Sequence, residues 1–459
     1  MAGSMAALLL FIQAASGQAP KGPYEAPDRE PTPQETLILE YMNRFRANPA
    51  AEADLIAPPG TNSRGVDWKM FHEEMKALKP APPLVFNLDL LDAARKHSYY
   101  MVFNGLGHDE IAGKPAYFGA SFGERCRLTG YKGGAGGENA FAGSGGPWDS
   151  HWGFVVDFGA GPGGMQPGRG HRTNMINPRF REVGPGGVPN GNGLSVTHDL
   201  GSRDTRMAGG VVYIDLKGSG FYDLGEGLGH VTITSSDGGA VTTWKSGAWA
   251  LDLKGQKEVT LTAFLDGEKS TKTFPAGPDN VKFDWVVPVE VPLRKADRFL
   301  AAVDAVKDHS SAKYSQALIS LSMNTQGLYL DADRKSRVAE LTKDIGPALE
   351  AAFKAVLDAV KGPDSPEQHK VIEEQAKPYH GTDADAWFKD AELILKLQRG
   401  VSNFQKQATV QKLTPKDKAQ VQAMLEAEGQ KLRTLTWKQE LSVLISRVRN
   451  VPTHAGDKP

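Results

Sequence analysis

The 459-residue sequence predicts a multidomain protein. Glycine-rich chain dominates from about residue 104 to 210, and short β-branched segments follow to about 292. The remainder is rich in Ala, Leu, Lys and Glu at helical spacing. We therefore expect a mixed helix-and-strand domain over 34–215, a small antiparallel β-sandwich over 216–292 and an all-α helical domain over 293–450. An average of roughly 150 residues per domain is consistent with three such domains.

The first residues predict export. The stretch "MAALLLFIQAASGQA" has the length and apolar character of a signal peptide, with small residues that suit cleavage near 17–19. We expect a signal peptide over 1–19, a proline-rich linker over 20–33 and a tail over 451–459. No Lys or Arg precedes the apolar core, so a mis-assigned start or an unstructured N-terminus stays the alternative. The prediction is a secreted, periplasmic or cell-surface protein.

Composition excludes several classes of partner. The formal net charge of -1 provides no overall field that would attract nucleic acid or an anionic membrane. No apolar run approaches the roughly 20 residues of a membrane-spanning helix, so an integral membrane protein is not expected. Cys126 is the single cysteine, so an internal disulfide is impossible.

Helix signals begin directly after the linker. Thr32, Pro33 and Glu35 predict an N-cap, a proline at the first helical position and a capping box. Leu90, Ala94, His97 and Met101 share one face of a second predicted helix, on which His97 is interpreted as a hydrogen-bonded core histidine. The segment 104–210 is expected to hold mostly loops and short strands, with "FVVDF" (154–158) as a strand.

Later segments separate clearly into two types. Runs such as "GGVVYIDL", "HVTITS" and "EVTLTAFL" are short and β-branched and lie between Gly, Asp and Ser turns. In the last third, Thr414-Pro415 and Ser365-Pro366 predict helix starts. Pro347 lies inside an apolar helical stripe and is expected to kink or divide that helix. This helical region resembles no family that would indicate its role.

Common catalytic signatures are absent. "GAGPGG" (159–164) satisfies G-x-G-x-x-G after an apolar run, but Pro162 and Pro167 interrupt the helix that should hold a pyrophosphate. The sequence has no phosphate-binding P-loop, no G-x-S-x-G elbow and no H-E-x-x-H pair. Nothing near Cys126 favours a thiolate, so this residue is expected to pack as a small hydrophobic side chain.

The remaining motifs occur in an informative order. "NRFRANPAAEA" is followed by "GLGHDE", then by "GGENAFAG", and finally by "GRGHRTNMINPRFREVGPG". In this combination the sequence resembles the CAP superfamily of cysteine-rich secretory, antigen 5 and pathogenesis-related proteins, in its disulfide-free bacterial form. The resemblance covers about residues 34–215 and implies an α-β-α sandwich with a surface cleft lined by two histidines and two acids.

Three cleft residues follow from the motifs. The resemblance implies His108 after the second helix, Glu138 of G-E-N and His171 of G-H-R as cleft residues. The family's W-x-x-E element is missing. His151 has the corresponding spacing after Trp148, and it is interpreted as cleft or exposed loop. Asp157 is preferred as the second acid.

Two imidazoles with one or two carboxylates suit several roles. They can hold zinc or another divalent cation with an open coordination position, or they can act as an acid and base pair. They can also simply hold glycine-rich loops together. CAP proteins have been linked to sterol and lipid binding, to metal binding and to proteolysis, so the resemblance does not decide among these roles. We expect a non-enzymatic module that binds a lipid, a peptide or a cell-envelope partner, because the added sandwich and helical domains resemble those of surface proteins. The alternative is a metal-assisted peptide or ester hydrolase using His108, Glu138 and His171.

A second candidate site follows the first domain. Asp215, Ser219, Asp223 and Glu226 occupy positions 1, 5, 9 and 12 of a calcium-binding loop. Lys217 stands at position 3, where a cation would repel calcium. The stretch also resembles the entry to small β-sandwich modules of bacterial surface proteins. A structural turn is therefore the preferred interpretation, with a degenerate calcium site as the alternative.

Overall fold

The computed structural model describes residues 22–26, 29–62, 65–362, 365–382, 384–410, 413–432, 434–449 and 451. The predicted signal peptide and all but the first residue of the predicted tail lie outside these residues. The chain forms two compact units, one comprising Met1–Gly239 and Thr243–Val289, the other Ala240–Thr242 and Glu290–Pro459. The described part of the chain contains no helix that is long and apolar enough to cross a membrane.

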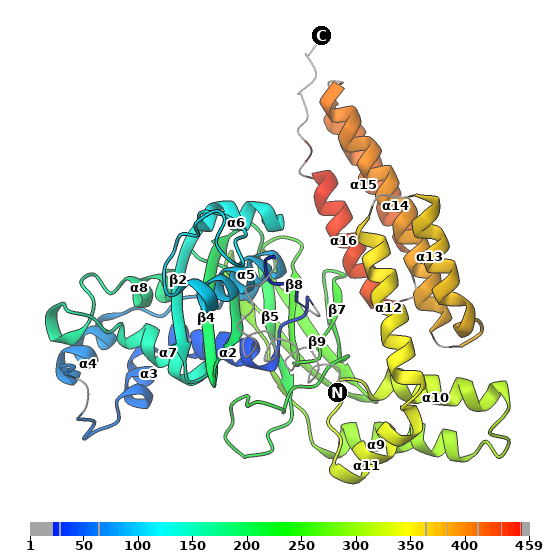
Figure 1. Ribbon diagram of the computed structural model, residues 1–459, viewed down its shortest axis with the longest axis horizontal. Coiled ribbons are helices and arrows are strands. Elements are labelled where there is room, and N and C mark those ends of the chain that lie inside the picture. The colour runs from blue at the N-terminus through cyan, green and yellow to red at the C-terminus, as the bar shows by residue number, and fades with distance from the viewer. Residues whose placement is uncertain are drawn as a thin grey trace. The chain divides into compact units, whose positions relative to one another are not determined.

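A four-stranded sheet organises the N-terminal part of the first unit (Figure 1). Its order is β1 (Val85–Phe86), β3 (Glu182–Asn190), β4 (Gly193–Ser202) and β2 (Gly134–Ser144). β1 pairs with β3 in parallel, and the other pairs are antiparallel. β2 is therefore an edge strand, and its Glu138 lies opposite Asp199 of β4.

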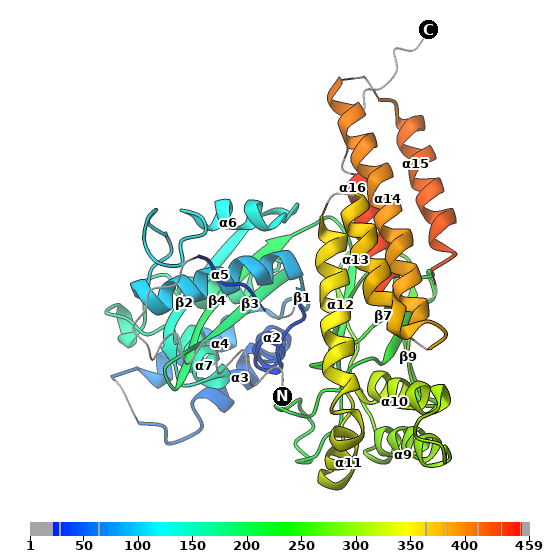
Figure 2. The same cartoon turned by 45° about the vertical axis from the view of Figure 1, so that its right-hand side comes forward.

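Helices cover both faces of this sheet (Figure 2). α5 (Leu88–Asn104) and α6 (Phe122–Thr129) lie on one face, and α2 (Pro33–Ala47) and α7 (Pro147–Val156) lie on the other. The second face also carries the main core, because Val196 and Leu200 of β4 pack among residues of α2 and α7. Further helices are α3 (Pro49–Ile56), α4 (Trp68–Ala77), α8 (Gly170–Ile176) and the 3-10 turn η1 (Pro162–Gly164).

The predicted helix signals are confirmed where the structure describes them. Thr32 accepts a hydrogen bond from the Glu35 amide, and Glu35 accepts one from the Thr32 amide, which completes the capping box of α2. Pro347 lies in the first turn of α12 (Ile345–Lys361), after α11 (Ala332–Thr342) has ended. Proline thus divides the apolar stripe into two helices, because its ring tolerates the first turn only. α13 and α15 begin at Pro366 and Pro415.

The expectation of loops and short strands over 104–210 is wrong. This segment contains three strands of 11, 9 and 10 residues, β2, β3 and β4. Their glycines mark close packing of a helix on the sheet. A Cβ at Gly184 would lie 2.1 Å from the α5 backbone, and one at Gly186 would lie 2.4 Å from it. "FVVDF" is also not a strand, because Phe154 to Val156 end α7.

The predicted sandwich region is partly parallel and not separate. β5 (Met207–Tyr213), placed before the predicted boundary at 215, pairs antiparallel with β8 (Ala248–Asp252). It also pairs in parallel with β11 (Val281–Lys282) and β12 (Trp285–Val286). β9 (Val259–Leu265) pairs antiparallel with β6 (Thr232–Ser235) and β10 (Glu268–Phe274). The strands on both sides of residue 215 therefore belong to one compact unit.

The second unit is mainly helical. α9, α10 and α11 share a small apolar core, and α12 to α16 pack around a larger one that includes Trp387 and Trp437. The bounds not yet given are β7 (Ala240–Thr242), α9 (Glu290–Asp304), α10 (Ala312–Thr325), α13 (Pro366–Ala376), η2 (Lys377–Tyr379), α14 (Asp385–Val410), α15 (Pro415–Gly429) and α16 (Leu435–Arg449).

Candidate functional site

The edge strand β2 places Glu138 beneath His108. His108 lies in the loop after α5, and its Nδ1 donates to Oε1 of Glu138 at 2.8 Å. The Arg125 guanidinium of α6 donates to the other oxygen of Glu138 and, at 2.9 Å, to the His108 carbonyl. Glu138 and Arg125 are buried, whereas the His108 side chain is 57% exposed. Two buried ionic groups thus present one imidazole to solvent.

A second layer of polar side chains supports this pair. His97 is fully buried, and its ring nitrogens lie 3.0 Å from Glu110 and 2.9 Å from the Gly107 carbonyl. Glu110 also accepts hydrogen bonds from the amides of Phe118 and Gly119. His97 is therefore the hydrogen-bonded core histidine that the helix pattern predicts. It is not separate from the cleft, because its Nε2 lies 3.8 Å from Glu138.

Electrostatics favour the charged forms of this pair. Burial alone would raise the pKa of Glu138, but the hydrogen bond from His108 and the charges of His97 and Arg125 lower it overall. The hydrogen bond to Glu138 in turn raises the pKa of His108.

Asp199 lies opposite Glu138 on β4 and is fully buried. No described residue donates a hydrogen bond to either of its carboxyl oxygens. Burial, followed by the charge of Glu138, raises the pKa of Asp199 well above its ordinary value. The protonated form of Asp199 is therefore the form that can donate a hydrogen bond to Glu138.

The second histidine pair comes from α7 and α8. Asp157 follows the last residue of α7 in a left-handed conformation, with φ of 61°. Its carboxylate is buried and accepts from the His171 Nδ1 at 2.8 Å and from the His171 amide at 3.0 Å. The His171 side chain is 20% exposed. Asp157 thus fixes both the backbone and the ring of His171.

Buried arginines anchor the chain that follows His171. Arg172 donates to the carbonyls of Val155 and Val156, which joins α8 to the end of α7. Arg46 of α2 is fully buried and donates to the carbonyls of Met175, Asn177 and Phe180. The segment 172–180 is therefore held to two helices, and it keeps His171 in place.

Two asparagines connect the histidine pairs across the edge strand. Asn139 of β2 donates to the His171 carbonyl at 3.2 Å. Asn174 of α8 donates to the Asn139 side chain at 2.9 Å and to the Glu138 carbonyl at 3.4 Å. We define the cleft as the site formed at β2 by His108, Glu138, Asp157 and His171.

Two more histidines lie on the α7 side of the sheet. His198 of β4 is fully buried, its ring lies 4.5 Å from the Phe154 ring, and neither nitrogen has a described hydrogen-bond partner. Burial lowers the pKa of His198 to about 3. His151 is neither exposed loop nor cleft, because it is buried in α7, and its Nε2 lies 2.8 Å from Glu52.

The candidate metal ligands of the described residues do not form a group of three. In the parts of the chain that the structure describes, no group of three or more His, Cys, Asp and Glu residues could hold a metal ion. His108 and His171 fit a metal only through Nε2, since each Nδ1 is bound to a carboxylate. This is the arrangement that metal-binding histidines use. The carboxylates of Glu138 and Asp157 then support the imidazoles rather than bind the metal.

The candidate calcium loop is held together by hydrogen bonds. Asp215 accepts from the amides of Ser219 and Gly220, and Glu226 accepts from those of Leu216 and Asp223. Lys217 donates to the Asp223 carboxylate at 2.8 Å. These contacts use the acids of the loop to hold a structural turn.

Sequence reasoning missed four members of the site. Glu110 and Asn174 lie within the quoted motifs, and Arg125 and Asp199 lie outside them, but nothing in the sequence marks any of the four as a partner of the histidines. Their contacts depend on the pairing of β2 with β4 and on the packing of α6. The helical face that carries His97 was the single local signal that pointed toward this network.

The match to one family model agrees with the motif order. Residues 39–199 match the model of the cysteine-rich secretory protein family, CAP. No curated protein matches the chain significantly. A solved structure, an extracellular protein containing a SCP domain from Bacillus anthracis str. Ames, is 22% identical over 27% of this chain and 35% of that chain, with a TM-score of 0.22. Residues 39–199 are therefore similar to the CAP family, and Cys126, which lies within them, is the single cysteine of the sequence.

Proposed function

We propose that the protein is an exported CAP-domain protein that binds a ligand or partner in the cleft without converting it. The observation that carries this proposal is that the imidazoles of His108 and His171 are held in the same way. Each Nδ1 is held by a buried carboxylate, and neither Nε2 has a described hydrogen-bond partner. Two oriented nitrogens on one surface can therefore bind a molecule without prior rearrangement.

The class of ligand is a lipid, a peptide or a component of the cell envelope. Export is supported by the apolar start of the sequence and by the CAP domain. Zinc is the smallest probe of the site, because neutral imidazole nitrogen is one of its preferred ligands. Solvent or the bound molecule would complete the coordination, since the described residues provide no group of three.

The test measures zinc content after dialysis against zinc, for the wild type and for His108→Ala and His171→Ala. We expect about one equivalent in the wild type and a loss in both variants, because a zinc site with only two imidazole ligands from the protein needs both. His309→Ala is the matched control, since His309 is an exposed histidine outside the cleft. Equal zinc in the wild type and both cleft variants would reject the cleft as the binding site.

The same variants distinguish the hydrolase alternative. A chelator-sensitive cleavage of peptides or esters that disappears in His108→Ala would overturn a purely binding role. In that case His108, Glu138 and His171 would be the residues to assign to the reaction.

A further inference from the structure

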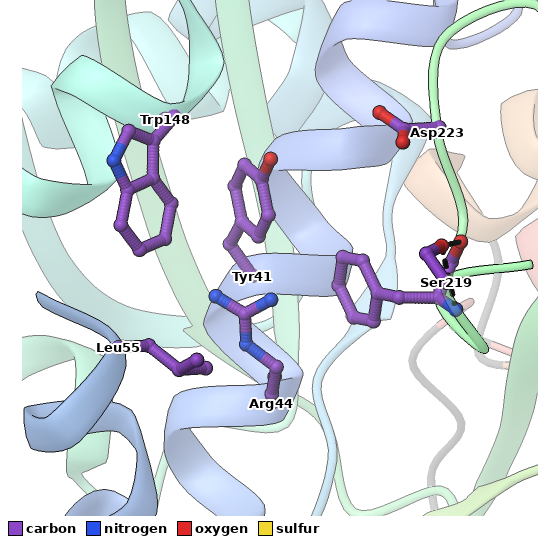
Figure 3. Close-up of a pocket in the computed structure, with 7 residues that line it drawn as sticks. Tyr41, Arg44, Leu55, Trp148, Ser219 and Asp223 are labelled. Atoms are coloured by element: carbon purple, nitrogen blue, oxygen red, sulfur yellow. Dashed lines mark hydrogen bonds between the residues drawn. The ribbon is translucent and has the colours of Figure 1, made fainter. Parts of the chain in front are cut away.

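A pocket of about 340 Å³ lies in the first unit and shares no lining residue with the cleft (Figure 3). Its walls come from α2, α3, α7 and the loop 215–226. The volume falls within the ~300–1,000 Å³ range of small-molecule sites. The lining residues are Tyr41, Arg44, Leu55, Trp148, Ser219, Phe221 and Asp223.

Three aromatic side chains, Tyr41, Trp148 and Phe221, line this pocket, which we call the aromatic pocket. Tyr41 stacks on Phe221 with 5.5 Å between ring centroids and meets Trp148 edge-on at 5.3 Å. Trp148 is 37% exposed at the rim. The Arg44 guanidinium lies 4.6 Å from the Phe221 centroid and 4.9 Å from the Tyr41 centroid. Flat apolar faces and a polar group therefore share one surface.

The Arg44 guanidinium is held in place by the buried carboxylate of Glu52. Its Nε and Nη2 donate to the two oxygens of Glu52 at 2.7 and 2.8 Å. The fully buried Glu52 is also bonded to His151. Burial alone would raise the pKa of Glu52, but the hydrogen bonds from Arg44 and His151 lower it to about 2. Arg44 Nη1 has no partner among the described residues, so it can donate to a ligand.

The loop 215–226 is braced in the same way. The Asp215 carboxylate accepts hydrogen bonds from the amides of Ser219 and Gly220. The Glu226 carboxylate accepts them from the amides of Leu216 and Asp223. Gly218 and Gly220 adopt left-handed conformations, with φ of +65° and +68°, which lets the chain turn over the pocket. The residues that resemble a calcium site thus place Phe221 and Asp223 at the wall.

Charge in the aromatic pocket is balanced internally. Glu52 neutralises Arg44, and Lys217 neutralises Asp223. The pocket therefore has no net charge with which to select an ion. It provides the exposed Trp148 ring for stacking, with Tyr41 and Phe221 packed beside it, together with hydrogen-bond donors and acceptors.

We propose that the aromatic pocket binds a neutral saccharide through one pyranose ring. The C–H face of the sugar stacks on the aromatic side chains, and its hydroxyls bond to Arg44 and Asp223. This second site goes beyond the proposed function of the cleft and does not depend on it.

The test is isothermal titration calorimetry of the full chain with two probes, triacetylchitotriose and cellotriose. We expect at least one trisaccharide to bind with a Kd of about 1 mM or lower. Phe221→Ala and Trp148→Ala should each weaken binding about tenfold, which corresponds to about 1.4 kcal/mol, because each removes an aromatic ring from the pocket wall. Trp148→Phe keeps a ring and should retain part of the affinity.

Phe264→Ala is the matched control for Phe221→Ala. Phe264 is 43% exposed on β9 and does not line the pocket, so its removal should leave saccharide binding unchanged. Circular dichroism and the Tm of each variant identify any loss of fold. Asp223→Asn keeps the size of the side chain and should weaken binding without loss of stacking.

Three results would overturn the proposal. The first is that neither trisaccharide binds at about 10 mM. The second is that neither Phe221→Ala nor Trp148→Ala weakens the binding. The third is that benzoate, titrated as a charged aromatic comparison, binds whereas both sugars do not. Failure here is distinguishable from failure of the cleft proposal. The pocket variants keep His108 and His171, so zinc content after dialysis reports on the cleft alone.

Discussion

The two faces of the central sheet bury titratable groups in different ways. On the face toward α5 and α6, Arg125, Glu110 and Glu138 form ion pairs beneath an exposed His108. On the face toward α7, His198 is buried with no described partner for either nitrogen. The ion pairs of the first face keep their charges because they are paired, whereas His198 on the second face, like Asp199 beside Glu138, is buried without an ion-pair partner among the described residues and favours its neutral form.

Because of this difference, the two faces should respond differently to mutation and to acid. A paired network is sensitive to the loss of one partner, because the charge that is left stays buried. A neutral buried histidine is sensitive to acid, because protonation is possible only after unfolding. Because His108 is exposed, its replacement should change the free energy of unfolding little by either effect.

The largest expected effect is that of Arg125→Met. This change leaves Glu110 and Glu138 without their buried cation and should lower the free energy of unfolding by about 3–5 kcal/mol. Urea denaturation measures the loss. Arg127→Met is the matched control on the same helix, since Arg127 is 70% exposed and, among the described residues, forms an ion pair only with Glu124. Equal costs for the two variants would show that the network is not a stabilising unit.

The second effect is the acid response of His198. The unfolded chain takes up a proton near the ordinary pKa of 6.5, whereas the folded chain does so only near 3. Stability should therefore fall as pH drops below 6.5, by about 1.4 kcal/mol per pH unit from this group. His198→Leu should remove that slope between pH 6.5 and 5.

The comparison for this prediction is His309→Leu, which removes an exposed histidine. Urea denaturation at several pH values should give the wild-type slope for this variant. The contradicting outcome is that His198→Leu retains the full wild-type slope. That result would mean that His198 of the folded wild type binds a proton as readily as in the unfolded chain, and that His198 is not held neutral.

The smallest effect is expected for His108→Ala. The pair with Glu138 is more than half exposed on the histidine side, so solvent screening limits its contribution to about 1 kcal/mol or less. Because the pKa of folded His108 is raised, this stability is present below pH 6.5 and disappears as pH rises through the raised value. Denaturation at pH 5.5 and pH 9 measures it.

Glu138→Gln tests whether the Glu138 carboxylate raises the pKa of His108. The titration of the His108 ring protons by NMR should move back toward the ordinary pKa when the carboxylate is replaced. An unchanged titration would mean that Glu138 does not hold the imidazole in solution.

The sequence by itself determined the local features of this protein. The capping box at Thr32, the helix that carries His97 and the division at Pro347 depend on residues within one or two turns of each other. The order of motifs also determined the CAP domain and with it His108, Glu138 and His171 as cleft candidates. Metal binding, calcium binding and the role of each acid stay predictions.

Only the tertiary structure decided which residues meet. Glycines that suggested loops are in strands, because a helix packs too closely to allow a Cβ at Gly184 or Gly186. Arg125 and Asp199 join the site through the packing of α6 and the register of β2 against β4. Phe221 reaches Tyr41 across 180 positions of sequence. Contacts of this kind depend on register and packing, which act between segments and leave no periodic signal along the chain.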